Sequence, residues 1–352
     1  MIIQSLKLKN FRNYELLNLT FHPVTNIFHG DNAQGKTNIL EAVYLAGTTK
    51  SHRGTKDRDM ISFGEEESHI EVKVLKNGVP FRIDIHLKKN SPKGAAINRM
   101  PVKRASELFG IINLVFFSPE DLNIIKNGPA QRRRFMDLEL SQLDKIYLNN
   151  LADYNRVVNQ RNRLLKEMAF QEKLKDTLEI WDMQLVRYGE RVMEGRKKFL
   201  REINEIVGDI HGKLTGGRER LVMEYEPSTG ELSLEEAVRR NRERDIRMKS
   251  TSAGPHRDDI CFKIKDMDIR KFGSQGQQRT AALSLKLAEI EIVKRVIHDT
   301  PVLLLDDVLS ELDKHRQNYL LDSIHDIQTL ITCTGVEEFV NHRFFFFFVF
   351  LV

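Results

Sequence analysis

The feature that most restricts the fold is a stretch of about 100 residues without proline, from Pro129 to Pro227. The stretch is rich in Leu, Glu, Lys and Arg, which favour helix. Side chains suited to packing recur every three or four residues in two runs, with a break in phase at 169–177. They are Leu151, Tyr154, Val158, Arg161, Leu165 and Met168, then Leu178, Trp181, Leu185, Tyr188, Val192, Gly195 and Phe199.

This spacing predicts an antiparallel helical hairpin with arms of roughly 25 to 35 residues, or about 40 to 50 Å. A helical bundle packed on a core is the alternative. After Gly216-Gly217, the pattern of residues 221–226 predicts a short strand. Ser233 with Glu236 then forms a capping box that opens a further helix with a dense basic face.

Strand and helix patterns alternate on both sides of this helical stretch, which is typical of an α/β domain. The expected strands are 24–28 and 69–75 before it, and 259–264, 301–306 and 330–333 after it. We therefore predict one α/β domain built from two distant halves, with an inserted lobe. The predicted boundaries are 1–121, 122–251 and 252–352.

Composition excludes several classes of protein. With 41% hydrophobic and 30% charged residues, the chain is expected to fold, and disorder is excluded. Two cysteines cannot build a disulfide framework, so a reducing, cytoplasmic location is expected. The net charge of +5 permits an acidic partner, and residues 122–251 carry most of it, with 26 Lys and Arg against 22 Asp and Glu.

The longest apolar run is Phe344–Val352 at the end of the sequence. Nine residues are about half of what a membrane-spanning helix needs, so no membrane association is expected. The run could be a terminal core strand, an exposed edge strand or the product of a shifted reading frame. We assign it no function.

The strongest local motif is a phosphate loop of the form G-x-x-x-x-G-K-[ST] between a strand and a helix. Backbone N–H groups at such a helix start converge on a phosphate. Lys36 is expected to reach the β- and γ-phosphates of ATP, and Thr37 to ligate Mg²⁺. A glycine-rich turn with an incidental Lys-Thr is the alternative. The expected nucleotide-binding residues are Gly30, Asp31, Asn32, Ala33, Gln34, Gly35, Lys36, Thr37 and Asn38.

A second motif supplies the acidic partner of this loop. The apolar run 302–305 ends in Asp306 and Asp307. A buried strand that delivers a carboxylate to the Mg²⁺ of a nucleotide is the usual companion of a phosphate loop. We assign Asp306 to the metal, through its waters, and Asp307 to orienting or deprotonating the attacking water. Alternatively, Asp307 caps a helix.

A third motif, Phe272–Arg279, leads into a long helix and forms a second candidate anion site. Ser274, Gly276 and Gln277 match the signature of the ATP-binding-cassette family, and Ser310–Asp313 resembles its D-loop. In that family, the signature of one subunit closes over the γ-phosphate held by another. The resemblance therefore implies an ATP-dependent homodimer with two nucleotides at its interface.

The long insert is similar to that of chromosome-maintenance and repair ATPases. Over residues 1 to about 335 the chain resembles the RecF family of bacterial recombination mediators. The motifs that carry this resemblance are FRNYE at 11–15, the loop at 30–42, KSHR at 50–53, SPEDL at 118–122, GPHRDD at 254–259 and FGSQGQQRT at 272–280.

The resemblance implies an ATP-binding-cassette-type P-loop ATPase head of α/β class with an inserted, mostly helical, coiled-coil-like hairpin lobe. It further implies an ATP-dependent DNA-binding protein of gap repair, replication and the SOS response. RecO and RecR are the implied partners in placing RecA on single-stranded DNA, and gapped or duplex DNA is bound without regard to sequence.

Some residues depart from the cassette pattern. Thr332-Cys333-Thr334 stands where the switch histidine is expected, and no Q-loop glutamine is found near Ser118–Asp121. Asp307 replaces the catalytic glutamate and is one methylene shorter. A misplaced general base costs orders of magnitude in rate, so we expect a weak ATPase in which ATP times dimer closure.

No base-reading motif is visible, so DNA binding is expected through the phosphate backbone. The candidate contacts are Lys50, Arg53, Lys56, Arg58, Arg132, Arg133 and Arg134, with an ordinary solvated surface as the alternative for each cluster. We expect His256 and Arg257 to stabilise a turn rather than to face the nucleotide. The rival functions are a P-loop enzyme for small molecules and a structural chromosome-type ATPase.

Overall fold

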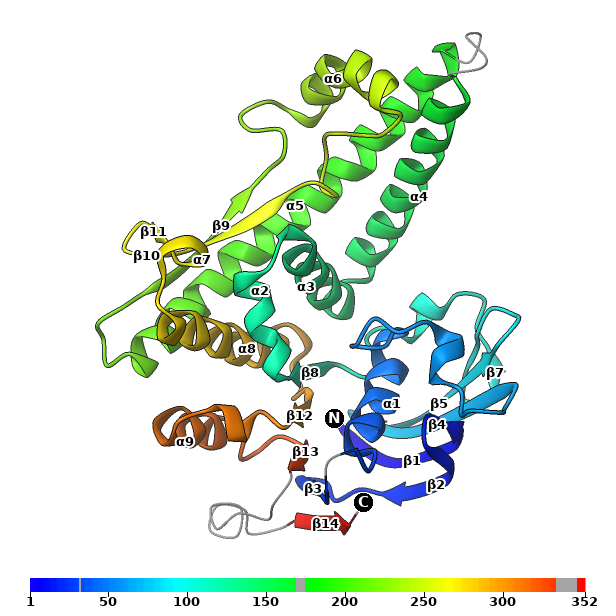
Figure 1. Cartoon of the computed structure of the whole chain (residues 1–352), viewed down its shortest axis with the longest axis vertical. Helices are drawn as coiled ribbons and strands as arrows, with labels where there is room; N and C mark the ends of the chain where they lie inside the picture. Colours follow the sequence, from blue (N-terminus) through cyan, green and yellow to red (C-terminus); the bar gives the residue numbers. More distant parts are fainter. Residues whose placement is uncertain (32, 169–174, 334–346, 352) are drawn as a thin grey trace. The chain divides into compact units, whose positions relative to one another are not determined.

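The computed structural model describes residues 1–31, 33–168, 175–333 and 347–351 (Figure 1). The fold is mixed α/β, as predicted. The chain divides into two compact units. The first comprises Met1–Asp121 and Leu285–Val352, and the second comprises Leu122–Ser284.

A parallel sheet of five strands forms one half of the first unit. The strands 24–28, 301–306 and 330–333 were predicted from short apolar runs, which are typical of strands buried on both faces. Strand β13 (Thr329–Cys333) lies in the middle of the sheet, so the carboxyl ends of β3 (Thr25–His29) and β12 (Val302–Asp306) lie on either side of it. The sheet order is β14 (Phe347–Leu351), β3 (Thr25–His29), β13 (Thr329–Cys333), β12 (Val302–Asp306) and β8 (Leu114–Phe117).

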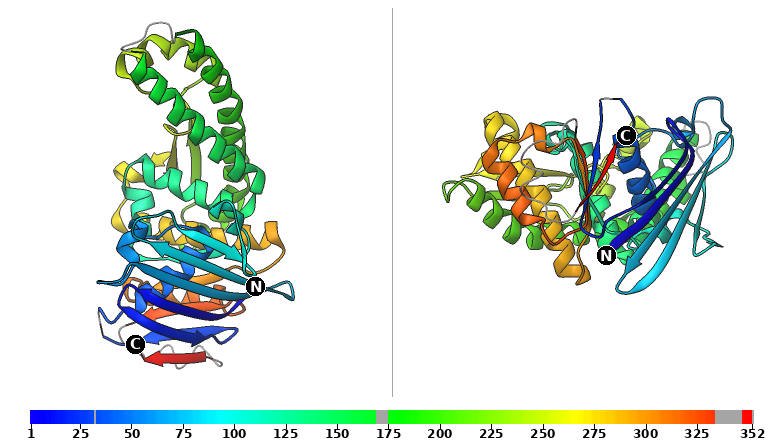
Figure 2. Two further views of the ribbon diagram at one scale, coloured as in Figure 1. Left: turned by 90° about the vertical axis from the view of Figure 1, so that its right-hand side faces the viewer. Right: turned by 90° about the horizontal axis from the view of Figure 1, so that it is seen from below.

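An antiparallel sheet of six strands forms the other half of this unit, and its blue to cyan strands lie side by side in Figure 2. Helix α1 (Lys36–Thr48) contacts strands of both sheets and is largely buried. Of these six strands, only the one at Glu67–Lys76 was predicted. The order is β2 (Tyr14–Thr20), β1 (Ile2–Phe11), β4 (Glu67–Lys76), β5 (Val79–Lys88), β6 (Gly94–Ile97) and β7 (Met100–Pro101).

Short helical segments complete the first unit. They are the 3₁₀ turns η1 (Asp57–Met60), η2 (Ala105–Leu108), η3 (Pro119–Asp121) and η5 (Leu309–Glu311), and helix α9 (Lys314–Ser323). Helix α8 (Gln275–Ile297) begins in the second unit and ends in the first.

The second unit contains the predicted helical hairpin. Its arms are α4 (Lys145–Glu167) and α5 (Lys175–Leu214), which pack against each other. The second arm has 40 residues and is longer than expected. Part of the predicted break at 169–177 lies outside the described residues. Leu164, Leu165 and Leu178 form a buried cluster at the far end of the hairpin.

This hairpin is not a free coiled coil, because other elements of the same unit cover it. Helix α3 (Pro129–Leu143), helix α6 (Leu234–Met248) and strand β9 (Leu221–Glu226) all contact α5. The predicted strand 221–226 and the capping box of Ser233 are confirmed; the Glu236 amide donates to Ser233 Oγ at 3.2 Å. The remaining elements are α2 (Leu122–Lys126), β10 (Asp259–Ile264), β11 (Met267–Asp268) and α7 (Ile269–Phe272).

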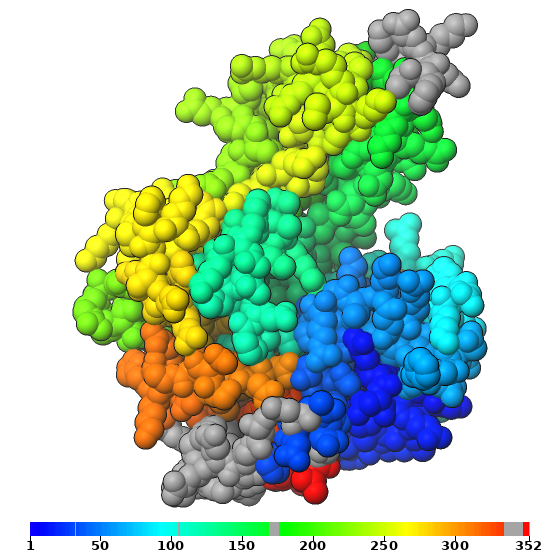
Figure 3. Space-filling model, in the orientation of Figure 1, coloured from blue at the N-terminus to red at the C-terminus, as the bar shows by residue number. Residues whose placement is uncertain are grey.

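The described part of the C-terminal apolar run is an edge strand. Strand β14 pairs in parallel with β3, and the Phe350 ring stacks on Phe28 with centroids 5.2 Å apart. It is the red segment of the space-filling view (Figure 3). Of the two strand alternatives for this run, the structure therefore favours the edge strand over the core strand. Among the described helices, none is long and apolar enough to cross a bilayer.

Candidate phosphate-binding site

The predicted phosphate loop joins β3 to α1, with Gly35 as the N-cap of the helix. Gly35 has φ = 109°, a left-handed conformation that L side chains rarely adopt. A Cβ atom there would lie 2.5 Å from Asn13 Nδ2 and 2.9 Å from the Tyr14 hydroxyl. Glycine is therefore required both by the backbone and by the close approach of residues 13–14. Of the predicted loop residues, Asn32 lies outside the described part of the chain.

Lys36 is a buried cation without a counter-ion among the described residues. Its side chain is 5% exposed, and its Nζ donates to the carbonyl oxygens of Gly30, at 2.6 Å, and Asp31, at 2.9 Å. Charges this deeply buried are normally paired. Because the first amides of α1 also lack helical partners, both features call for an anion at this place.

Thr37 and Asp306 meet, as the sequence predicted. Thr37 Oγ1 donates to Asp306 Oδ1 at 2.8 Å. Thr332, at the end of β13, donates to the same carboxylate oxygen at 2.8 Å and accepts from the Asp307 amide at 3.0 Å. Burial raises the pKa of Asp306, and the charge of Asp307 adds to the rise, while the two threonine hydroxyls oppose it. The Thr332 contacts were not predicted.

Asp307 has φ = 51°, another left-handed conformation, which costs a non-glycine residue about 1 kcal/mol or more. The bond from its amide to Thr332 holds it there. The N-cap of the following turn η5 is Val308, and no side chain caps that turn. The capping alternative for Asp307 is therefore not supported, and Asp313 instead caps α9 by accepting from the Arg316 amide.

The buried carboxylate of Glu41 connects two of the sequence motifs by hydrogen bonds. Glu41 on α1 accepts two hydrogen bonds from Arg12, both at 2.8 Å, and one from Ser51. Burial opposes ionisation of Glu41, but the bonds from Arg12 and Ser51 hold its pKa below the usual range. The motifs at 11–15 and 50–53 are thus joined through α1. Sequence reasoning noted both motifs but missed Glu41.

The amide of Asn13 links the same motif to the loop itself. Asn13 Nδ2 donates to the Gln34 carbonyl at 2.9 Å, and its Oδ1 accepts from Asn38 at 2.8 Å. Arg53 in turn donates to Asn38 Oδ1 at 3.2 Å. Arg53 is therefore hydrogen-bonded to Asn38 beside the phosphate loop.

The signature segment lies in the second unit. Ser274 Oγ accepts from the Gln277 amide at 3.2 Å, and Gln277 Oε1 accepts from the Ser274 amide at 2.9 Å, which makes a capping box at the start of α8. Ser274 and Gly276 are exposed. The predicted exposed helix start is therefore present, and its side chains are ordered by these reciprocal bonds.

The predicted DNA contacts divide into exposed and buried residues. Lys50, Lys56 and Arg58 are exposed, whereas Arg132 is only 2% exposed. Arg132 makes a two-pronged ion pair with Asp259, so its prediction as a surface contact is wrong.

The neighbours of Arg132 differ. Arg133 is partly buried and donates to the Asp258 carbonyl at 2.8 Å, while Arg134 is exposed. These three consecutive arginines therefore do not form one surface cluster.

The structural interpretation of His256 and Arg257 is supported. The Tyr154 hydroxyl lies 2.6 Å from His256 Nδ1, and the Thr251 carbonyl lies 3.1 Å from Nε2. Burial lowers the pKa of His256 to about 4. Arg257 donates to the Thr251 carbonyl and to Ser250.

Comparisons with known proteins find close relatives. The family model described as RecF/RecN/SMC N terminal domain matches residues 2–343. DNA replication and repair protein RecF of Lachnospira eligens is 64% identical over 345 residues, which are 97% of this chain and 95% of the relative. The protein of the same name from Agathobacter rectalis is 63% identical over 344 residues, 98% of this chain and 95% of its own.

The similarity extends to solved structures. A structure of the recombination mediator protein RecF with ATP in the RecFOR pathway is 36% identical to this chain. It covers 96% of this chain and 93% of its own, with a TM-score of 0.91.

Proposed function

The chain belongs to the RecF family, and from this premise we propose that it is an ATP-dependent DNA-binding protein of recombinational gap repair, replication and SOS induction. The single observation that carries the proposal is the buried ammonium of Lys36, whose hydrogen-bond partners among the described residues are two carbonyl oxygens. An anionic ligand would complete this site. The triphosphate of ATP matches it, and a relative of known structure is described with ATP.

The residues present fit a nucleotide with its metal. The amides of the loop and Lys36 would hold the phosphates, and Thr37 with Asp306 would hold Mg²⁺, the carboxylate through water. A hydroxyl and a carboxylate 2.8 Å apart are oxygen donors of the kind that Mg²⁺ prefers. Bound there, the metal would neutralise phosphate charge during transfer to water.

Hydrolysis is proposed to be slow. Asp307 is the candidate general base, and its backbone is fixed by the bond from its amide to Thr332. The shorter side chain would hold the base away from its best position, and misplacement of a base lowers the rate steeply. ATP would then act as a switch for association, with Ser274, Gly276 and Gln277 closing over the nucleotide of a second copy.

The proposed domain assignment takes 1–121 and 252–352 as the ATPase head and 122–251 as the inserted lobe. In the structure the compact unit that contains the lobe extends to Ser284, so residues 252–284 of the proposed head belong to that unit. RecO and RecR are the proposed partners, with RecA loaded on single-stranded DNA as the result. The solved relative is described as part of the RecFOR pathway, which supports this assignment.

Helix α6 is our candidate for a DNA-backbone contact in the lobe. Arg240, Arg244 and Arg247 are exposed, and none of the three has an ion-pair partner in the part of the chain that the structure describes. Their spacing of four and three residues places them on one face over about 10 Å. Backbone binding by such a stripe is independent of sequence and depends strongly on salt.

Replacing these three arginines by alanine is expected to reduce the salt slope of DNA binding by about 3. The matched control replaces Lys7, Lys9 and Lys73 by alanine. These lysines are exposed on β1 and β4, and their replacement removes the same charge. Equal slopes for the two triple variants would mean that the α6 face is merely solvated.

The central experiment is sedimentation and DNA binding with and without ATP and Mg²⁺. We expect ATP to promote a dimer that retains DNA, and Lys36→Met and Ser274→Arg each to abolish this effect. Lys88→Met and Ser91→Arg, at exposed positions of the first unit, are the matched controls.

The rival functions give different results in this experiment. A P-loop enzyme for small molecules would show no ATP-dependent retention of DNA. A structural chromosome-type ATPase that associates through its arm would dimerise without ATP. Normal dimerisation of Ser274→Arg would refute the role of the signature in closing over a second copy.

A further inference from the structure

The start of α8 is held by two side-chain contacts that no motif predicts. Gln277 Nε2 donates to Glu219 Oε1 at 2.8 Å, and Glu219 lies in the turn between α5 and β9. Gln278 Nε2 donates to the Ile269 carbonyl of α7 at 2.8 Å. The two neighbouring glutamines thus attach the signature to different elements of the second unit.

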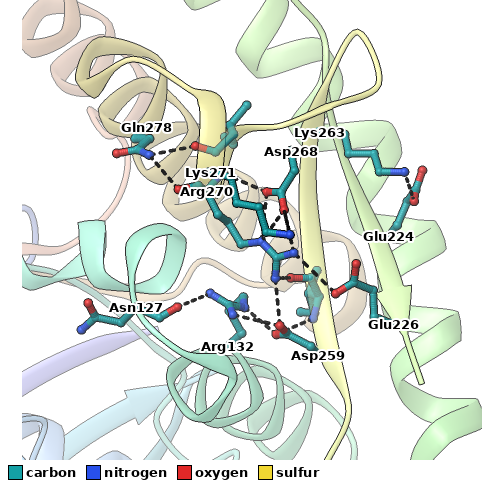
Figure 4. Close-up of polar contacts among 12 residues, drawn as sticks. Asn127, Arg132, Glu224, Glu226, Asp259, Lys263, Asp268, Arg270, Lys271 and Gln278 are labelled. Carbon is teal, nitrogen blue, oxygen red and sulfur yellow. Dashed lines mark hydrogen bonds and ion pairs between the residues drawn. The ribbon is translucent and has the colours of Figure 1, made fainter. Parts of the chain in front are cut away.

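The Gln278 contact fixes a tight corner between α7 and α8 (Figure 4). Gln278 is 7% exposed, and its amide also approaches the Arg270 carbonyl at 3.5 Å. At the corner, a Cβ on Gly273 would lie 2.6 Å from the Ile269 carbonyl oxygen. A side chain at position 273 would therefore not fit this corner.

Ion pairs tie α7 to the rest of the unit. Arg270 Nη1 donates to Asp259 Oδ2 at 2.8 Å, and the same carboxylate accepts from Arg132 Nε at 2.6 Å. Asp268, which caps α7, also binds the Arg270 guanidinium. Figure 4 shows Arg132 and Arg270 converging on Asp259 from α3 and α7. These ion pairs hold α7 in place, and with it the corner that leads into α8.

The second attachment of the start of α8 depends on Glu219. Its carboxylate also lies 3.5 Å from His211 Nε2, and His211 Nδ1 is 3.0 Å from Ser284 Oγ, two turns along α8. Gln277 meanwhile uses its Oε1 for the capping box with Ser274. The Glu219 bond therefore sets the orientation of the Gln277 amide that closes the exposed end of the signature.

We propose that Glu219 is a positioning residue for the signature, acting through Gln277. The proposal rests on the proposed function, in which the signature closes over the nucleotide of a second copy. A hydrogen bond to a carboxylate is stronger than a neutral one, so its loss is expected to weaken that closure about tenfold. Glu219 lies in the second unit, so nucleotide binding by a monomer at the phosphate loop is expected to remain intact.

The test compares Glu219→Ala, Glu219→Gln and Glu224→Ala. The glutamine variant keeps an acceptor oxygen for Gln277. Glu224 is a matched control, because it lies on β9 and pairs with Lys263 at 2.6 Å, away from the signature. Three quantities are measured: amide hydrogen exchange at residues 275–280 without nucleotide, the ATP concentration that half-saturates dimerisation, and the affinity of the monomer for a fluorescent ATP analogue.

We expect Glu219→Ala to accelerate exchange at 275–280 and to raise the half-saturating ATP concentration, each about tenfold. Monomer affinity should stay within about twofold in every variant, as should all three quantities for Glu224→Ala. Glu219→Gln keeps a neutral acceptor, so its exchange and its half-saturating ATP concentration should lie between those of Glu219→Ala and the unaltered protein. Unchanged exchange in Glu219→Ala, or equal damage in Glu219→Gln, would overturn the positioning role. Failure of the unaltered protein to dimerise with ATP would instead refute the proposed function, and the exchange comparison without nucleotide would still decide the role of Glu219.

Discussion

The geometry of Gly35 predicts that its replacement by alanine destabilises the first unit and prevents ATP binding. The left-handed backbone at φ = 109° costs an alanine about 1 to 2 kcal/mol. The added Cβ, 2.5 Å from Asn13 Nδ2, also displaces the Asn13 amide. Its bonds to Gln34 and Asn38 are then lost, at about 1 kcal/mol each.

Together these effects amount to about 3 to 4 kcal/mol, or a fall in melting temperature of roughly 6 to 16 °C. The matched control is Gly64→Ala. Gly64 has φ = 87° but nothing within 4 Å of its Cβ position, so it suffers the backbone strain alone. Its expected cost is about 1 to 2 kcal/mol. The difference between the two variants therefore isolates the clash with Asn13.

Melting temperatures are measured for both variants with and without ATP and Mg²⁺. Ligand binding to the native state raises the melting temperature, so the control should respond like the unaltered protein and Gly35→Ala should not. Equal destabilisation of the two variants, or a full response of Gly35→Ala to ATP, would refute the argument that residues 13–14 close the loop.

Three further results are expected. The pKa of His256 is about 4 in the native state and about 6.5 when unfolded, so the unfolded state binds more protons between these pH values. The free energy of unfolding should therefore fall by up to about 3 kcal/mol as the pH drops from 6.5 to 4. Urea unfolding across this range should show a shallower fall in His256→Gln. Arg132→Ala should lower the unfolding free energy by about 2 kcal/mol, because Asp259 loses one of the two arginines that pair with it. DNA affinity measured well below the melting temperature should keep its salt slope; a reduced slope would restore Arg132 as a DNA contact. Chelation of Mg²⁺ should diminish the ATP-induced rise in melting temperature, whereas an unchanged rise would argue against Thr37 and Asp306 as its ligands.

The elements predicted from sequence are those whose signals are local. The strand before Gly30, the strand before Asp306 and the capping box of Ser233 each depend on a few adjacent residues. The hairpin was predicted because its spacing persists over many turns. The length of α5 was underestimated because its packing pattern continues past Phe199 to contact β9, another element of the same unit.

What the sequence could not predict depends on partners far apart in the chain. Arg132 looks like its two arginine neighbours, and only Asp259, 127 residues away, makes it a buried ion pair. Glu41 gives no local signal, since its partners come from the motifs at 11–15 and 50–53. Long-range ion pairs of this kind have no period or spacing that a single sequence reveals.

The electrostatics of the phosphate loop explain why ligand and fold should be coupled. Lys36 is buried against neutral carbonyls, and the partly buried Asp306 lies beside the like charge of Asp307, which the charge of Arg53 only partly opposes. Among the described residues neither Lys36 nor Asp306 forms an ion pair. The threonine hydroxyls around Asp306 and the carbonyls around Lys36 offset only part of the desolvation. A phosphate beside Lys36 and a divalent cation beside Asp306 would supply the missing charges together. The loop is thus least stable in the absence of its ligands, which is the property required of an element that switches on binding ATP.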